Sequence, residues 1–236
     1  MAQRINEHGQ PIGADVEGWV ARPRPPLTAL TGTYADVVPL RAADHGDALF
    51  AAFKTDKSGA MWTYMPNGPF ARRADFDAFL DGAETSPDPL YYAIINTSTG
   101  RAEGLASYLR IKPAVGVIEV GFIALSPLLQ KTRVATEAMF LMMSHVFDDL
   151  GYRRYEWKCD NLNGRSKAAA RRLGFTYDGM FAQATIYKGR NRDTAWFSIL
   201  DRDWPHVKAG FQAWLAPENF DASGMQRTAL VTRPAS

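Results

Sequence analysis

The chain contains 236 residues, enough for one large domain with extensions or for two small domains. Hydrophobic residues make up 46% and charged residues 22%, which is the composition of an ordinary globular protein with a sizeable core. The formal net charge of +2 gives no reason to expect a nucleic-acid partner, because proteins that bind polyanions carry clustered basic faces.

The cysteine content and the N-terminal sequence indicate in which cellular compartment the protein is expected. Cys159 is the single cysteine, which excludes an internal disulfide and a multi-cysteine zinc site, and we expect no metal. The opening stretch MAQRINEHGQPIG is polar and has no apolar run before a cleavage site. No stretch approaches the roughly 20 apolar residues of a membrane span. We therefore predict a cytoplasmic protein without a membrane partner.

Residues 1–31 predict an extended N-terminal arm. Prolines throughout the segment, including Pro11 and the Arg-Pro-Arg-Pro-Pro run at 22–26, disfavour a helix. A disordered tail is the simpler alternative. Side chains such as Val16 and Trp19 are too apolar for a free tail, so we expect the arm to lie across the domain.

The next elements are a strand, two helices and an aromatic loop. Residues 32–40 predict the first strand, and a helix opens near His45. A second helix carries Phe76 on its apolar face. Between the helices lies the loop 62–70, rich in aromatic residues, proline and glycine. Two interpretations of its aromatic side chains, Trp62 first among them, stay open: they plug the edge of the domain, or they form the wall of a substrate pocket.

The apolar run from Val117 to Leu125 predicts the central strand of the chain. Its length, its β-branched residues and the Ser-Pro stop at 126–127 favour a strand buried on both faces over a buried helix. One carboxylate, Glu119, lies inside the run. Two closely spaced strands at 90–96 and 104–111 precede it, and this spacing predicts an antiparallel meander.

A short loop at 128–132 and a long helix follow the central strand. Apolar residues outside the main stripe of this helix, such as Phe140, indicate that it is covered on more than one side. The order strand, polar loop, helix N-terminus is suited to holding an anion on free backbone N–H groups, helped by roughly half a positive charge from the helix dipole. The stripe consists of Val134, Ala138, Met142, Val146 and Leu150.

Residues 154–160 alternate strictly and predict the next strand. Tyr155, Trp157 and Cys159 share one face of it. Nothing in the sequence marks a base beside Cys159. We therefore interpret this cysteine as a packed small side chain rather than a nucleophile.

Two motifs carry a resemblance to a known family. The stretch Ala-Leu-Ser-Pro-x-x-Gln-x-x-x-x-Ala-Thr-Glu-Ala at 124–138 resembles the acyl-CoA loop of the GNAT superfamily of N-acetyltransferases, in the branch related to enzymes that acetylate ribosomal-protein N-termini. The family loop reads Gln/Arg-x-x-Gly-x-Gly/Ala, and its amides bind the CoA pyrophosphate. Gln130 and Ala135 match this pattern, whereas Arg133 stands at the central glycine. Either the loop conformation tolerates arginine, or the guanidinium is itself a phosphate donor.

The second motif runs from Asn163 to Phe175. It resembles the GNAT element in which Asn-x-x-Ser opens a helix that ends in Leu-Gly-Phe. Asn163 suits an N-cap, and Gly174 suits the left-handed turn after the helix. Strands at 177–188 and 194–200 then form the expected closing hairpin. The resemblance covers residues 32–204, and it leaves a C-terminal helix with a tail loosely held from Asn219 in 205–236.

The resemblance implies an α+β fold (the α/β three-layer GNAT fold) with a mixed, mainly antiparallel central sheet flanked by helices. It also implies an N-acetyltransferase that moves an acetyl group from acetyl-CoA to a primary amine by direct attack. The acceptor stays open between a peptide N-terminus and other amines, and the protein is a monomer or a homodimer. A non-catalytic acyl-CoA sensor on the same fold is the alternative, and its signature would be loss of the catalytic base.

Glu119 is the candidate general base. Desolvation inside an apolar strand disfavours the charged form of a carboxylate and so strengthens it as a proton acceptor. It also matches the strand glutamate that several GNAT enzymes use. The alternative is a structural glutamate paired with an arginine such as Arg110.

Ser166 is the candidate acid, because Ala170 lies near the position where many GNAT enzymes carry a tyrosine. Helix capping, or a hydrogen bond to pantetheine, is its alternative role. By resemblance, the amides of Ile123 and Leu125 hold the thioester and pantetheine. The remaining cofactor-binding candidates are Gln130, Lys131, Thr132, Arg133, Val134, Ala135, Thr136, Asn163 and Ser166. The substrate-binding candidates are Trp62, Tyr64 and Tyr187.

Overall fold

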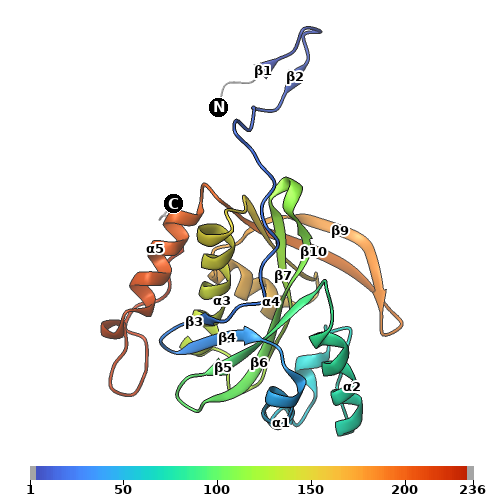
Figure 1. The fold of residues 1–236 in the computed structure, drawn as a ribbon, viewed down its shortest axis with the longest axis vertical. Helices are drawn as coiled ribbons and strands as arrows, with labels where there is room; N and C mark the ends of the chain where they lie inside the picture. The colour runs from blue at the N-terminus through green and yellow to red at the C-terminus, as the bar shows by residue number, and fades with distance from the viewer. Residues whose placement is uncertain (1–3, 233–236) are drawn as a thin grey trace.

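The computed structural model describes residues 4–232 and centres on one eight-stranded sheet (Figure 1). Its strand order is β3-β4-β5-β6-β7-β8-β10-β9, and every neighbouring pair is antiparallel except β7 with β8. This is the mixed, mainly antiparallel sheet that the sequence predicts. The sheet strands are β3 (Leu30–Thr31), β4 (Ala35–Pro39), β5 (Leu90–Asn96), β6 (Arg101–Lys112), β7 (Val117–Leu125), β8 (Arg154–Asp160), β9 (Thr176–Tyr187) and β10 (Arg190–Leu200).

Helices cover both faces of this sheet. Met142 and Phe211 lie in the larger of two buried clusters, in which α3 and α5 cover one face. Phe53 and Phe76, from α1 and α2, lie in the smaller cluster on the opposite face. The helix α3 is covered on a second side as expected, since Phe140 stacks on Phe211 with ring centroids 5.1 Å apart. The helices are α1 (Ala42–Phe53), α2 (Arg73–Glu84), α3 (Arg133–Ser144, continued by a π-turn at His145–Asp149), α4 (Gly164–Arg172) and α5 (Trp204–Leu215).

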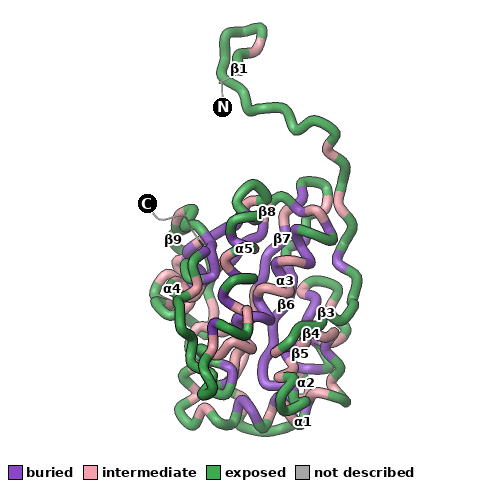
Figure 2. Tube along the Cα trace, turned by 90° about the vertical axis from the view of Figure 1, so that its left-hand side faces the viewer, coloured by how far each residue is buried: buried purple, intermediate pink, exposed green. Residues whose placement is uncertain are grey.

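The N-terminal arm divides into two parts. A small hairpin of β1 (Arg4–Ile5) and β2 (Pro11–Ile12) projects away from the domain and is almost wholly exposed (Figures 1 and 2). Farther along, the indole Nε1 of Trp19 donates to the carbonyl of Ala114 at 2.8 Å, and the Tyr152 hydroxyl donates to the carbonyl of Pro23 at 3.0 Å. The arm therefore lies across the domain only in its second part, and its predicted end at residue 31 is already the sheet strand β3.

The C-terminal segment differs from the sequence prediction of a tail loosely held from Asn219. Asn219 is buried, its Nδ2 donates to the carbonyl of Trp214 at 2.9 Å, and its Oδ1 accepts from the amide of Thr228 at 2.9 Å. Phe220 and Gln226 form an isolated β-bridge inside the loop. The Asn219 side chain at the centre of the loop thus holds the loop in place. The sequence does not reveal this, because a polar composition is also typical of a loosely held tail. The prediction for residues 233–236 lies outside the described residues.

No helix in residues 4–232 combines the length and the apolar character needed to cross a membrane.

Candidate active site

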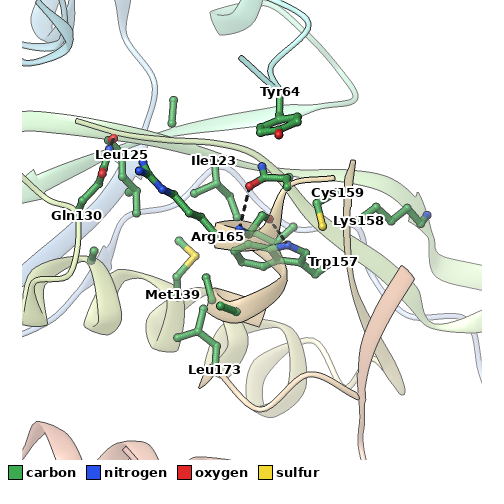
Figure 3. Close-up of a pocket in the computed structure, with 18 of the residues that line it drawn as sticks. Tyr64, Ile123, Leu125, Gln130, Met139, Trp157, Lys158, Cys159, Arg165 and Leu173 are labelled. Carbon is green, nitrogen blue, oxygen red and sulfur yellow. Dashed lines mark hydrogen bonds between the residues drawn. The ribbon is translucent and has the colours of Figure 1, made fainter. Parts of the chain in front are cut away.

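A cleft opens where β7 and β8 separate. Their parallel pairing ends at Val120 and Trp157 within the described chain, although β7 runs on to Leu125 and β8 to Asp160. We call this point the fork. A cavity of about 2280 Å³ starts at the fork and extends to the N-terminus of α3 and the first turns of α4 (Figure 3). Two strands that part in this way leave backbone groups facing the cavity instead of each other.

A β-bulge directs the backbone of β7 into the fork. Phe122 has a left-handed φ of 48°, and the pairing of β7 with β6 shifts register nearby. The amide of Ser126 donates to the carbonyl of Glu103 on the β6 side. Because the backbone groups of successive residues in a strand point to opposite sides, those of Leu125 and Ile123 point into the fork. These two amides therefore face the cavity.

The loop between β7 and α3 is shaped by its own side chains. The side-chain amide of Gln130 donates to the carbonyl of Leu125 at 2.9 Å, and its backbone amide donates to Ser126. Thr132 is the N-cap of α3, and its hydroxyl accepts from the amide of Ala135 at 3.2 Å. Gln130, Thr132 and Ala135 line the cavity, but their hydrogen-bonding groups named here are used inside the loop.

Three residues of this region line the cavity and have backbone N–H groups without a protein acceptor in the described chain. Among residues 4–232, no protein acceptor pairs with the amides of Lys131, Arg133 and Val134. The amide of Thr136, also a candidate, instead donates to the carbonyl of Thr132 within the helix. Free amides at a helix N-terminus, together with the helix dipole, favour an anion.

Arg133 needs no glycine-like backbone. The left-handed residue of the loop is Lys131, with φ 64°, and Arg133 is the first residue of α3. The loop conformation therefore tolerates a side chain at 133. Its guanidinium carbon lies 4.1 Å from the ring centre of Tyr34 and 5.0 Å from that of Phe220.

Asn163 and Ser166 open α4 beside the fork. The Asn163 side chain caps the helix by accepting from the amide of Ser166 at 3.0 Å. The Ser166 hydroxyl lines the cavity and accepts from the indole Nε1 of Trp157 at 3.0 Å, a bond that does not use the hydroxyl's own proton. Cys159 is buried as predicted. Burial raises the pKa of its thiol, and the neighbouring Ser166 hydroxyl opposes this shift.

Glu119 lies one residue before the end of the β7–β8 pairing and lines the cavity. It is only 3% exposed, and both of its ion pairs are made by Oε2: with Arg110 at 2.7 Å and with Lys158 at 2.8 Å. The pairing with Arg110 that the sequence analysis offered as the alternative is therefore present. Glu119 is therefore a paired carboxylate and not the isolated acid that the strand pattern suggests.

A buried charge network extends from Glu119 across the sheet. The Lys158 ammonium also pairs with Glu156 at 2.9 Å and lies 3.6 Å from the ring centre of Trp196. Glu156 in turn pairs with Arg154 at 2.7 Å. Hydrogen bonds from Arg154 and Lys158 hold the pKa of Glu156 below its usual value, against the opposing effect of burial. Each named charge of this network has an opposite charge beside it.

The aromatic candidates on the acceptor side separate into two groups. Trp62 is buried, stands edge-on to Phe53 at 5.2 Å and does not line the cavity, so the edge-plug interpretation holds and its substrate-binding role is withdrawn. Tyr64 lines the cavity, and its hydroxyl donates to the carbonyl of Leu162 at 3.3 Å. Tyr187 does not line the cavity itself. Its hydroxyl donates to Asp160 Oδ2 at 2.8 Å, and Asp160 does line the cavity.

The aromatic loop is also bonded to the tip of the β9–β10 hairpin. The Lys188 ammonium donates to the carbonyls of Trp62 at 2.9 Å and Asn67 at 3.2 Å. Arg190 donates to the carbonyl of Thr63 at 2.7 Å. These contacts join a loop and a hairpin that are far apart in the sequence and that both contribute residues to the cavity lining.

Comparisons with known proteins identify the family. A family model described as "Acetyltransferase (GNAT) domain" matches residues 37–176. The chain belongs to the GNAT acetyltransferases. It is 49% identical to a GCN5-related N-acetyltransferase from Brucella melitensis, over 91% of this chain and 97% of that one, with a TM-score of 0.89. No curated protein matches the sequence.

Two further structures are similar to this GNAT protein. A probable GNAT-family acetyltransferase from Chromobacterium violaceum is 39% identical over 83% of this chain and 98% of that one, with a TM-score of 0.77. RimL, a ribosomal α-N-protein acetyltransferase whose structure contains coenzyme A, is 19% identical over 73% of this chain and 97% of that one, with a TM-score of 0.61. The likeness to RimL shows the common fold alone.

As a GNAT protein, the chain is an acyltransferase, and the family transfers acetyl groups from acetyl-CoA to amines. The cavity fits such a donor, because it combines the open fork with three free amides at a helix N-terminus. Within residues 4–232, no cluster of three or more His, Cys, Asp or Glu side chains could hold a metal ion.

Sequence reasoning missed three charged residues of this GNAT cleft. Lys158 joins Glu119 only because β7 and β8 pair, and no local pattern reveals that partnership. Arg165 and Arg172 lie on α4 and line the cavity without a carboxylate partner among the described ion pairs. Figure 3 shows Arg165 reaching from α4 toward Leu125. Their positions inside the recognised Asn-x-x-Ser helix were the available signal.

Proposed function

We propose that this protein transfers the acetyl group of acetyl-CoA directly to a primary amine, with Glu119 as the general base. The observation that carries the proposal is the position of Glu119 at the fork, where β7 and β8 stop pairing and the cavity begins. The acceptor nitrogen attacks the thioester carbonyl carbon, the C–S bond breaks, and the amine proton passes to the carboxylate. The acetylated amine and the CoA thiol are the products.

The two oxygens of Glu119 have different roles in this proposal. Oε2 is held by Arg110 and Lys158, which fix the orientation of the carboxylate. Oε1 faces the side of Gly121, where a side chain would lie 3.5 Å from it, and it has no hydrogen-bond donor among the described residues. Oε1 is therefore the oxygen that receives the amine proton, directly or through one water molecule.

Ser166 supplies the proton that the leaving thiolate needs. Its hydroxyl accepts from Trp157, which orients the oxygen without using the hydroxyl proton. A thiolate whose conjugate acid has a pKa near 8.5 can also take a proton from water, so this contribution is smaller than that of the base. The amides of Ile123 and Leu125 hold the thioester and the pantetheine arm.

We propose an acceptor with a slender end, either a peptide α-amino group or a small-molecule amine. The aromatic loop and the hairpin border this side of the cavity, and Lys188 and Arg190 bond them to each other, which would leave a narrow approach. A lysine on a folded surface has poor access to such a space. At pH 7 about one α-amino group in ten is neutral, against fewer than about one lysine in a thousand. Tyr64 forms part of the acceptor wall.

A panel of amines tests the proposal. Acetyl-CoA is supplied with peptides that have a free N-terminus, with N-blocked peptides that contain lysine, and with small amines, and thiol release is measured. We expect turnover with free N-termini or small amines and little with blocked peptides. CoA binding without turnover on any amine would favour the acyl-CoA sensor. Turnover confined to blocked lysine peptides would contradict the acceptor class.

A further inference from the structure

Two arginines at the N-terminal end of α3 rest on aromatic rings. Arg133 lies over Tyr34 and Phe220, at 4.1 and 5.0 Å from the ring centres. Arg172, from α4, lies 5.0 Å from the ring centre of Trp214 and donates to the Thr136 hydroxyl at 3.2 Å. We call Arg133 and Arg172 the guanidinium pair. The three rings, Tyr34, Trp214 and Phe220, are called the aromatic platform.

The platform attracts the guanidinium pair but leaves its charge uncompensated. Neither arginine forms an ion pair with a carboxylate among residues 4–232. An aromatic face attracts a cation through its quadrupole and carries no net charge. Both arginines also line the cavity. Two positive charges therefore face the cleft next to the free amides of the α3 N-terminus.

Hydrogen bonds from other parts of the chain hold the platform in place. The carboxylate of Glu137, on α3, accepts from the amides of Thr33 at 3.1 Å and Ala35 at 2.7 Å, and so fixes the turn that carries Tyr34. The indole Nε1 of Trp214 donates to Gln226 at 2.8 Å. Trp214 and Phe220 stand edge to face, with ring centres 5.1 Å apart.

The position of the platform in the chain is informative. Trp214 and Phe220 lie beyond residue 176, where the match to the GNAT family model ends. The segment from Trp214 to Gln226 nevertheless contributes to the lining of the cavity. Residues outside the matched family domain thus help to hold two arginines at the α3 end of the cavity.

We propose that the guanidinium pair binds phosphate groups of the 3′-phospho-ADP portion of CoA, and that the aromatic platform is a positioning element of the donor site. The inference rests on acetyl-CoA as the donor. Arginine suits this task because its planar fork matches phosphate oxygens and because it can stack on a ring while it donates hydrogen bonds. Trp214 and Phe220 act through the arginines and do not touch the ligand in this account.

Calorimetric titration with CoA and with 3′,5′-ADP tests the proposal on the full chain. The variants are Arg172→Gln, Phe220→Leu and Phe220→Tyr. Arg171→Gln is the matched control, because Arg171 neighbours Arg172 on α4 but lies outside the cavity lining and over Phe197. Thermal unfolding of each variant identifies any that fails to fold.

We expect Arg172→Gln to weaken binding of both ligands about tenfold at low salt, with a smaller loss at high salt. Phe220→Leu weakens binding several-fold, Phe220→Tyr restores it because the ring returns, and Arg171→Gln stays near wild type. Equal affinities for wild type and Arg172→Gln would overturn the proposal. So would a Phe220→Tyr variant that folds yet binds as weakly as Phe220→Leu.

A truncated donor separates this inference from the proposed function. S-acetylpantetheine lacks the nucleotide, so the loss of kcat/KM caused by Arg172→Gln should be at least several-fold larger with acetyl-CoA than with S-acetylpantetheine. Equal losses with both donors would contradict the phosphate role. Failure of the wild-type protein to acetylate any amine, with CoA binding intact and sensitive to Arg172→Gln, would instead overturn the proposed function alone.

Discussion

The two ends of the cleft differ in whether their charged side chains have ion-pair partners. At the fork, the Glu119 carboxylate lies 2.7 Å from Arg110 and 2.8 Å from Lys158, and the network continues through Glu156. At the α3 end, the guanidinium groups of Arg133 and Arg172 rest on aromatic rings and have no carboxylate partner among the described ion pairs. In the described chain, the charges at the fork are thus paired with opposite charges, and those at the α3 end are not.

This difference indicates which end depends on a ligand. A network of paired charges keeps its geometry without further partners, so it can hold a catalytic carboxylate in a fixed orientation. Cations without counter-charges gain most when an anion arrives, and a ligand that binds the folded state raises its stability. We therefore assign proton transfer to the compensated end and recognition of the donor phosphates to the uncompensated end.

Replacing the base, Glu119, removes the carboxylate from the compensated end and has the largest expected effect on turnover. Glu119→Gln should lower turnover on the order of 10² to 10⁴-fold, because a general base acts on the reaction step. CoA affinity should stay close to wild type, since the arginine end is intact. Steady-state kinetics and calorimetry check the two quantities separately. A loss of CoA affinity as large as the loss of turnover would mean that the two ends are not independent.

Removing one cation tests the uncompensated end. Arg133→Ala should weaken acetyl-CoA binding several-fold or more at low ionic strength, because a charge-assisted contact is worth about 1.5 to 3 kcal/mol when well formed and less when solvent reaches it. Salt should shrink the effect. Titration at two ionic strengths measures both. Unchanged affinity at each would make the Arg133 side chain a bystander and leave binding to the backbone amides.

Removing the acid candidate has a smaller effect. Ser166→Ala should lower turnover less than Glu119→Gln does, because water can protonate a thiolate whose conjugate acid has a pKa near 8.5. The variant loses the hydroxyl that Trp157 contacts but keeps the backbone that Asn163 caps. Parallel kcat measurements on the two variants check the order. A larger loss from the serine would reverse the assignment of the dominant catalytic group.

The smallest expected effect concerns stability in acid. The folded-state pKa of Glu156 is lowered from 4.5 by hydrogen bonds from Arg154 and Lys158, so its contribution to stability is present above that value and is lost as the pH falls through the folded-state pKa. Glu156→Gln should be less stable than wild type near pH 7. The gap in unfolding free energy should narrow below pH 4.5. Denaturant titrations at several pH values measure it, and a constant gap would contradict the linkage.

The strands of the fold could be predicted closely from the sequence. Apolar runs bounded by turn residues predict β5 and β7, and strict alternation predicts β8, with the bounds that the structure has. The free amides before α3 also follow from the order strand, loop, helix. These features depend on neighbours in the sequence, which a single chain reveals.

The partners of the site residues could not be predicted, because they depend on contacts between distant segments. Lys158 meets Glu119 through the parallel pairing of β7 and β8, and that pairing turns an apparently isolated acid into a paired one. Phe220 meets Arg133 from a distant part of the chain. Trp62 looked available for a substrate, yet its ring packs on Phe53 in the core. Aromatic residues in a loop do not indicate by themselves which side they face.

The general-base role of Glu119 is tested by the pH dependence of kcat for wild type and Glu119→Gln at saturating acetyl-CoA and acceptor. We expect the wild-type rate to level off well below the pKa of the acceptor amine. The rate of the variant should rise about tenfold per pH unit toward that pKa, because only amine already neutral can react without a base. Coincident profiles in the two proteins would contradict the assignment of Glu119 as the general base.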